Sequence, residues 1–266
     1  MTFRDILAGE ARKALTLRSL TLATLISTVV MLAFTLVDAL AAVLVNPARG
    51  SVSGLPGIDA GTYCFFYFSF LPIIIAVLVT SSEYAGGQLT VSMLAVPRRG
   101  AVLAAKLVTV VVATLGLAIL QAVMILACYQ GMLGENSVFA TGGGWQHLGL
   151  LAQGVLYWLM LGVLSMSVAV IFRQQTGVLA VMVSLAFLST PLLMISTAIF
   201  QYLPANVGTM MFMAREDVSN IASDPGALMG VPAATAVTVL WSVVAIIAAA
   251  IVFTRRDVGA RLASAE

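Results

Sequence analysis

The chain has 266 residues, of which 61% are hydrophobic and only 9% are charged, and its formal net charge is +2. A soluble domain needs far more charge on its surface, so this composition excludes a soluble globular protein. The mean hydropathy of +1.07 instead indicates a chain that lies mostly within a membrane.

The N-terminal segment, residues 1–19, predicts an amphipathic helix that lies in the cytoplasmic membrane interface. Apolar residues recur on one face at helical spacing, and charged residues such as Arg12 and Lys13 point elsewhere. Glu10 interrupts the apolar face. Two interpretations of Glu10 are open: a carboxylate that reaches for water, or an ion pair with a basic residue of the helix bundle.

Six apolar runs follow, each long enough to cross a hydrocarbon core of ~30 Å. They are predicted at residues 20–45, 63–81, 102–128, 147–172, 177–200 and 232–254. Pro191 in the fifth run removes a backbone hydrogen bond and should kink that helix. We therefore predict an all-α polytopic membrane protein that forms a single domain over residues 1–266.

Basic residues set the predicted orientation. With six spans, one side of the membrane receives Arg4, Arg12, Lys13, Arg18, Arg98, Arg99, Lys106, Arg173, Arg255, Arg256 and Arg261, and the other receives only Arg49 and Arg215. Lys and Arg accumulate in cytoplasmic loops, so both termini are predicted to be cytoplasmic.

The predicted outer connection at residues 201–231 contains an apolar cluster at 210–213. Apolar residues outside a span favour short helices that dip into the outer leaflet. Such backbone is tolerated there only when it packs against protein or lines a cavity. A plain surface loop is the alternative.

Three polar side chains fall in the outer parts of predicted spans. Asp38 is either a functional intramembrane carboxylate or a residue that reaches the interface, because position 46 is only about 12 Å further along a helix. Gln121 and Gln153 each need a hydrogen-bonding partner, which indicates a neighbouring helix or a water-filled path. Together with Pro191, these residues are candidates for lining a translocation path.

The sequence contains no constellation typical of catalysis. No Gly-x-x-x-x-Gly-Lys-Ser/Thr motif occurs, so the chain is not expected to hydrolyse ATP by that route. His147 is the single histidine, there is no Gly-x-Ser-x-Gly elbow, and no metal site is predicted. Cys64 and Cys128 lie near the outer ends of neighbouring spans and are either a disulfide or two thiols packed as small hydrophobes.

The stretch between the second and third spans carries a pattern that resembles a known family. It runs Ser82-Glu83-Tyr84-Ala85-Gly86-Gly87-Gln88-Leu89, then Val96-Pro97-Arg98-Arg99, and then Lys106. This pattern resembles the first cytoplasmic loop of the permease subunits of ABC-2 type transporters. The N-terminal helix with Glu10 and Lys13 is similar to their interfacial elbow helix, and residues 253–258 resemble their usual ending.

The resemblance implies an ABC-2 (type V exporter-like) fold and a set of partners. Residues 82–100 would dock as a coupling helix on a separate ABC ATPase subunit. The contacts would come from Glu83, Tyr84, Gln88, Leu89, Pro97, Arg98 and Arg99. The alternative for Arg98 and Arg99 is anchoring to anionic lipid headgroups. ATP and Mg would bind the ATPase rather than this chain, and a second permease copy, identical or different, would complete a dimer in the bacterial inner membrane.

The resemblance also implies a function, namely outward movement of a hydrophobic or amphipathic cargo such as a drug, an antimicrobial peptide or a lipid-like molecule. A Met-rich interior suits such a cargo, since Met adapts to varied surfaces. Two other classes stay open. An ion- or proton-coupled secondary carrier would show inverted repeats and several midplane charges. A non-transporting immunity or sensory subunit would only bind an ATPase. A nucleic-acid partner is not expected.

Overall fold

The computed structural model of the protein describes residues 2–45, 61–85, 99–213 and 215–255. These residues form helices and turns with no strand among them, which confirms the prediction of an all-α chain. Six helical segments are long and apolar enough to cross a membrane, as predicted. They are Arg18–Ala41, Cys64–Ser81, Gly100–Leu133, Gly144–Phe172, Gln175–Leu192 and Val231–Arg255. The chain therefore has the helices of a multi-pass membrane protein.

The helices that make up these spans and their connections have the following bounds. They are α1 (Phe3–Thr16), α2 (Arg18–Val45), α3 (Cys64–Tyr67), α4 (Phe70–Ala85), α6 (Arg99–Ile125), the π-helix η1 (Leu126–Gln130), α7 (Gly131–Leu133), the 3-10 helix η2 (Gly134–Asn136), α8 (Val138–Thr141), α9 (Gly144–Phe172), α10 (Gln175–Leu192), α11 (Thr197–Phe200), α12 (Pro204–Phe212), α13 (Arg215–Ile221), the 3-10 helix η3 (Pro225–Ala227) and α14 (Val231–Arg255).

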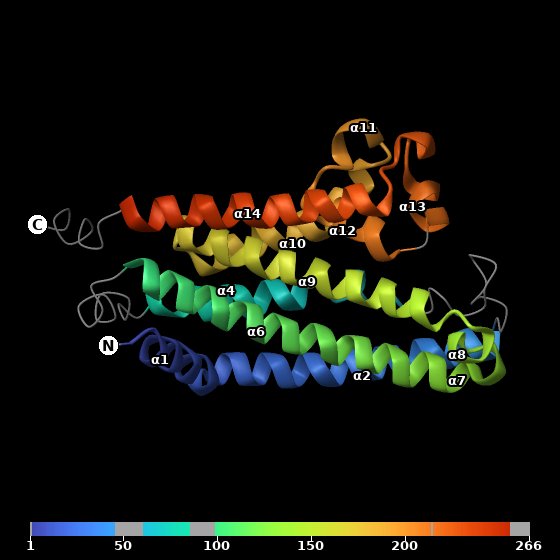
Figure 1. The fold of residues 1–266 in the computed structure, drawn as a ribbon, viewed down its shortest axis with the longest axis horizontal. Coiled ribbons are helices and arrows are strands. Elements are labelled where there is room, and N and C mark those ends of the chain that lie inside the picture. The colour runs from blue at the N-terminus through green and yellow to red at the C-terminus, as the bar shows by residue number, and fades with distance from the viewer. Residues whose placement is uncertain (1, 46–60, 86–98, 214, 256–266) are drawn as a thin grey trace, which may run out of the picture.

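The long helices run side by side along the longest axis of the molecule (Figure 1). Helix α1, the start of α6 and the end of α14 lie at one end, shown on the left. The short helices α7, α8, α11 and α13 lie at the other end. The two ends of the bundle thus differ, and the first described helix begins at the same end at which the last one stops.

Helix α9 is the centre of the bundle and contacts α4, α6, α12 and α14. Its Tyr157 and Trp158 are fully buried. Two of its glycines allow the close approaches: Gly154 faces the Phe65 ring, and Gly162 faces Thr114 of α6. Small residues at helix crossings are the usual means by which membrane helices pack, since lipid supplies no hydrophobic drive between them.

Helix α1 is separate from the first span. Thr2 caps its N-terminus through a capping box with Asp5, and Leu17, with an extended backbone, ends it. The interfacial helix predicted over residues 1–19 thus stops at Thr16, and the first span starts at Arg18 rather than at residue 20.

The second span is broken between α3 and α4. The Ser69 amide donates to the Phe66 carbonyl, in a tighter turn than an α-helix, and the indole of Trp158 in α9 donates to the Phe65 carbonyl at 2.7 Å. Broken helices at membrane depth need such substitutes, because lipid offers no hydrogen bonds. The carbonyl freed at the break thus forms a hydrogen bond that joins the second span to the fourth.

The third and fifth spans differ most from their predicted limits. The third continues past residue 128 through η1 and α7 to Leu133. The fifth ends at Leu192, so the prediction of a kinked span that continues to residue 200 is wrong. Pro191 cannot donate to the ladder, and the chain leaves the helix one residue after it.

Residues from the predicted outer connection form part of the core. Every residue of α12 is buried, and the helix packs against α9, α10 and α14. Gly208 lies directly against the Tyr157 ring, where a Cβ atom would come within 1.9 Å of Cδ2. A plain surface loop, the alternative for this segment, does not describe α12.

Candidate functional site

The predicted coupling loop lies partly outside the described residues. Gln88, Leu89, Pro97 and Arg98 are among those outside. Glu83 and Tyr84 belong to the last turn of α4, which ends at Ala85, and Arg99 begins α6. The loop is therefore shorter than residues 82–100 at both ends, and it joins two helix ends that lie on the same side of the bundle as α1 (Figure 1).

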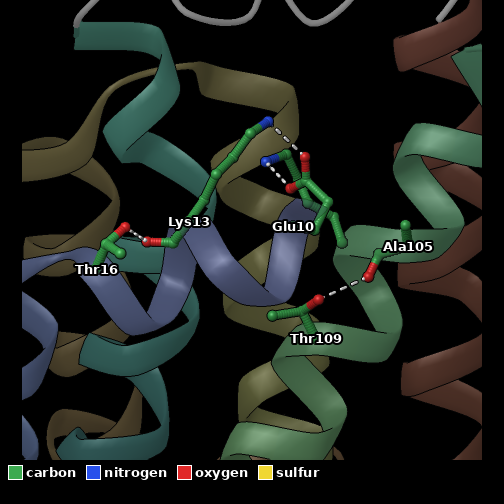
Figure 2. A network of polar contacts seen from close by, with 6 residues as sticks. Glu10, Lys13, Thr16, Ala105 and Thr109 are labelled. Atoms are coloured by element: carbon green, nitrogen blue, oxygen red, sulfur yellow. Dashed lines mark hydrogen bonds and ion pairs between the residues drawn. The ribbon is translucent and has the colours of Figure 1, made fainter. Parts of the chain in front are cut away.

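Glu10 joins α1 to α6 at this end of the bundle. One carboxylate oxygen, Oε1, accepts from Nζ of Lys13 at 2.7 Å, and the other, Oε2, accepts from Nζ of Lys106 at 2.9 Å. Figure 2 shows the contact between Lys13 and Glu10 beside α6. Of the two interpretations open for Glu10, the structure shows the ion pair, and Lys106 is the basic residue of the bundle.

The Glu10–Lys106 pair is buried. Glu10 is 6% exposed and Lys106 is 1% exposed, whereas the Lys13 side chain is 40% exposed. An unpaired charge in such surroundings is costly, and removal of one partner of a buried pair typically costs about 3–5 kcal/mol. The pair therefore holds α1 in one position on α6, and Lys106 follows the end of the predicted loop at residue 100 by only six residues.

Other charges of α1 face outward. Arg12 is exposed, in contrast to Glu10 two positions earlier. Asp5 is also exposed, and hydrogen bonds from the Thr2 hydroxyl and the Thr2 amide lower the pKa of its carboxyl. Asp5 thus stabilises the start of α1 as part of its capping box.

A second polar cluster lies at the opposite end of the bundle, around Asp38. Oδ2 of Asp38 accepts hydrogen bonds from the hydroxyls of Tyr63 and Tyr129, and the two hydroxyl oxygens are 2.7 Å apart. Asp38 lies about 30 Å along α2 from Arg18, at ~1.5 Å per residue. This distance matches the ~30 Å core, so the carboxylate is at interface depth when Arg18 is at the other interface.

Local backbone features place Tyr129 in this cluster. Tyr129 belongs to the π-helix η1, which shifts the direction of the side chains that follow α6. Gly61, with a φ of 78°, lies so close that a Cβ atom there would be 2.6 Å from the Tyr129 ring. Only glycine fits both this backbone conformation and this approach.

The candidate path residues Gln121 and Gln153 lie inside the bundle. Gln121 is fully buried, and neither polar atom of its side chain has a hydrogen-bond partner among the described residues. Oε1 of Gln153 likewise has none within the described part of the chain. Such atoms need water or a partner from outside the described residues.

The residue beside Pro191 that sequence reasoning missed is Asn206. Its side-chain amide donates to the carbonyls of Ser189 and Phe200, both at 2.9 Å, and Asn206 is fully buried. It thus holds together the end of α10, the end of α11 and the start of α12. Asn206 is a lone Asn within the apolar run at 204–212. A polar residue in such a run needs a hydrogen-bonding partner, so the sequence pattern could have indicated its structural role.

The remaining side chains with reactive or metal-binding groups are dispersed. Cys64 and Cys128 are both buried free thiols rather than a disulfide. Among the described residues, no three His, Cys, Asp or Glu side chains lie together in a way that could hold a metal ion.

Comparison with known proteins gives no assignment. No protein-family model matches the sequence, and no curated protein is significantly similar to it. The resemblance to ABC-2 permeases thus depends on the residues quoted above and on their order along the chain.

Proposed function

We propose that this chain is a membrane-spanning permease subunit of an ATP-binding-cassette exporter with an ABC-2 fold. A separate ATPase subunit would bind the loop between α4 and α6, supply ATP and Mg, and drive outward movement of a hydrophobic or amphipathic cargo. A second permease copy would complete the transporter in the bacterial inner membrane, with both termini in the cytoplasm.

The buried pair between Glu10 and Lys106 is the observation that carries the proposal. A loop that receives force from a partner moves the bundle only when the adjoining helices are rigidly joined at that end. Glu10 joins α1 to the first two turns of α6, and α1 also contacts α2. Force on the loop would therefore reach three helices as one body, as a rigid-body change of access requires.

The placement of charge favours an ATP-driven subunit over an ion-coupled carrier. In the described spans the charged residues lie toward the helix ends: Arg18 and Asp38 in α2, Lys106 in α6 and Arg255 in α14. Helices α9 and α10 contain no Asp, Glu, Lys or Arg. A carrier driven by protons or ions depends on charged groups near the midplane, so this placement supports an external source of energy.

A photo-crosslinking experiment tests the proposal. A photoreactive residue at Gln88 in the full chain, expressed in its native host, should capture a protein that carries a Walker A motif. The matched control places the same residue at Trp145, which is 87% exposed at the start of α9, toward the other end of the bundle. That position should capture no ATPase.

Loop variants extend the test to coupling. Glu83→Ala, or replacement of Pro97, Arg98 and Arg99 by neutral residues, should uncouple the ATPase while the protein still inserts into the membrane. Unchanged ATPase capture and unchanged transport in both variants would contradict the assignment of residues 82–100. Unchanged capture with lost transport would mean that the variant still binds the ATPase but no longer couples it to transport.

A further inference from the structure

The cluster around Asp38 has an exposed aromatic side in addition to its hydrogen bonds. The Tyr67 ring lies 5.7 Å from the Tyr63 ring and 5.8 Å from the Phe34 ring, measured between centroids. Tyr67 is 50% exposed and Phe34 is 38% exposed, although both belong to apolar helices. These rings thus form an open surface next to the carboxylate.

The groups of this surface follow one another along α2 in a fixed order, from charged to apolar. Phe34 precedes Asp38 by four residues, so the two share a face of the helix and lie one turn apart. The carboxylate is at the interface end, and the Phe34 ring lies about 6 Å deeper along the helix, at ~1.5 Å per residue. A ligand that matches this order has a charged group at one end and an apolar body at the other.

The charge of that group follows from Asp38. Two phenol hydroxyls stabilise its carboxylate, but neither neutralises it, and no described basic side chain forms an ion pair with it. At interface depth, a carboxylate without a described basic partner attracts cations by Coulomb interaction. The faces of Tyr and Phe rings carry partial negative charge and therefore also attract organic cations, as in aromatic sites for quaternary ammonium groups.

We infer that Asp38, Tyr63, Tyr67 and Phe34 form a binding site for amphipathic organic cations at the outer end of α2 and α3. A phosphate needs a basic side chain, and none of the described ones lies at this site. The site therefore favours a ligand with a net positive charge over a zwitterionic lipid headgroup, which carries a phosphate. The inference concerns binding by this chain alone, and it names the class of cargo only if the proposed exporter function holds.

Two ions of equal size and opposite charge provide the test. Equilibrium binding of tetraphenylphosphonium and of tetraphenylborate is measured on the full chain, purified in a non-ionic detergent without any ATPase. The chain should bind the phosphonium and show at least about tenfold weaker binding of the borate. Equal binding of both ions would overturn the inference, since hydrophobic partition alone gives that result.

Variants then locate the site. Asp38→Asn keeps the shape but removes the charge, and it should weaken phosphonium binding at least about tenfold. Glu135→Gln removes an exposed carboxylate from the same end of the bundle and should leave binding unchanged. Wild-type affinity in Asp38→Asn would contradict the inference.

A third variant keeps the test decisive if Asp38→Asn fails to fold. Tyr67→Leu removes an exposed ring that makes no hydrogen bond to Asp38, and it should weaken binding severalfold. An unchanged affinity would contradict a role of the aromatic surface in binding. Displacement of the phosphonium by a zwitterionic phosphocholine at equal concentration would indicate a lipid headgroup site instead. Because no ATPase is present, these results do not depend on the coupling loop.

Discussion

Glu10 and Lys106 are 96 residues apart in the sequence, yet their side chains meet at 2.9 Å within the protein interior. One comes from α1 and the other from the first turns of α6. The pair therefore fixes how α1 lies against α6, at the end of the bundle where the proposed partner would bind.

Loss of the Glu10 carboxylate should destabilise the protein. Glu10→Ala leaves Lys106 buried without its carboxylate, and we expect a loss of about 3–5 kcal/mol in the free energy of unfolding. Lys106→Ala should cost less, because Lys13 still neutralises Glu10. The measurement is unfolding of the purified chain in detergent.

A double variant and a surface variant control this prediction. Glu10→Ala combined with Lys106→Ala should lose less than the sum of the two single losses, since the residues interact directly. Arg12→Ala, which changes an exposed charge of the same helix, should stay within about 0.5 kcal/mol of wild type. Additive losses would mean that the pair contributes no coupling.

Asn206→Ala should destabilise the junction of α10, α11 and α12. The change leaves the carbonyls of Ser189 and Phe200 without the amide that now donates to them. Each unsatisfied buried group costs about 1–3 kcal/mol, so the melting temperature should fall clearly. Asn220→Ala, at an exposed position in α13, is the matched control and should have little effect. Equal effects of the two variants would argue against a structural role for Asn206.

Two glycines of α9 should respond to alanine in opposite directions. Gly154→Ala places a Cβ atom 2.4 Å from the Phe65 ring and should cost about 1–3 kcal/mol through overpacking. Gly149→Ala meets nothing within 4 Å and should gain about 0.5–1 kcal/mol, because alanine favours the helix. Thermal unfolding of both variants checks the sign of each change.

The start of α1 should depend on pH through Asp5. Because hydrogen bonds from Thr2 lower the pKa of Asp5 in the folded helix, this stabilisation is present above 3.8, the ordinary pKa, and is lost as the pH falls through the lowered value. Thr2→Val should raise the pKa of Asp5 toward its ordinary value, and Thr2→Ser should keep it low. A carboxyl NMR titration of the three proteins decides whether the hydroxyl is the cause.

The spans could be predicted from the sequence because each is an apolar run of membrane length. The ends of the spans were less predictable where the backbone leaves regular α-helical geometry. Pro191 was expected to kink a continuing span, but Asn206 holds the helix end from a later segment, and that contact is not local. The burial of α12 likewise arises from packing against three other helices.

Individual side chains were predictable as candidates, but their partners were not. The position of Glu10 on an apolar face indicated an ion pair as one of two outcomes, yet nothing in the spacing selected Lys106. For Asp38 the sequence left open a functional intramembrane carboxylate and a residue that reaches the interface. Its contacts with Tyr63 and Tyr129 depend on a tight turn at Gly61 and on the π-helix η1. Such contacts join residues that are distant in sequence, so pattern alone does not identify them.

Purification of the tagged full chain from its native host in a mild detergent, with the stoichiometry of its partners determined, decides whether the chain works with an ATPase. We expect an ATP-binding-cassette ATPase at one copy per copy of this chain, and we expect it to be lost when Pro97, Arg98 and Arg99 are replaced by neutral residues. An intact, folded chain that purifies without any ATPase would contradict the proposed function.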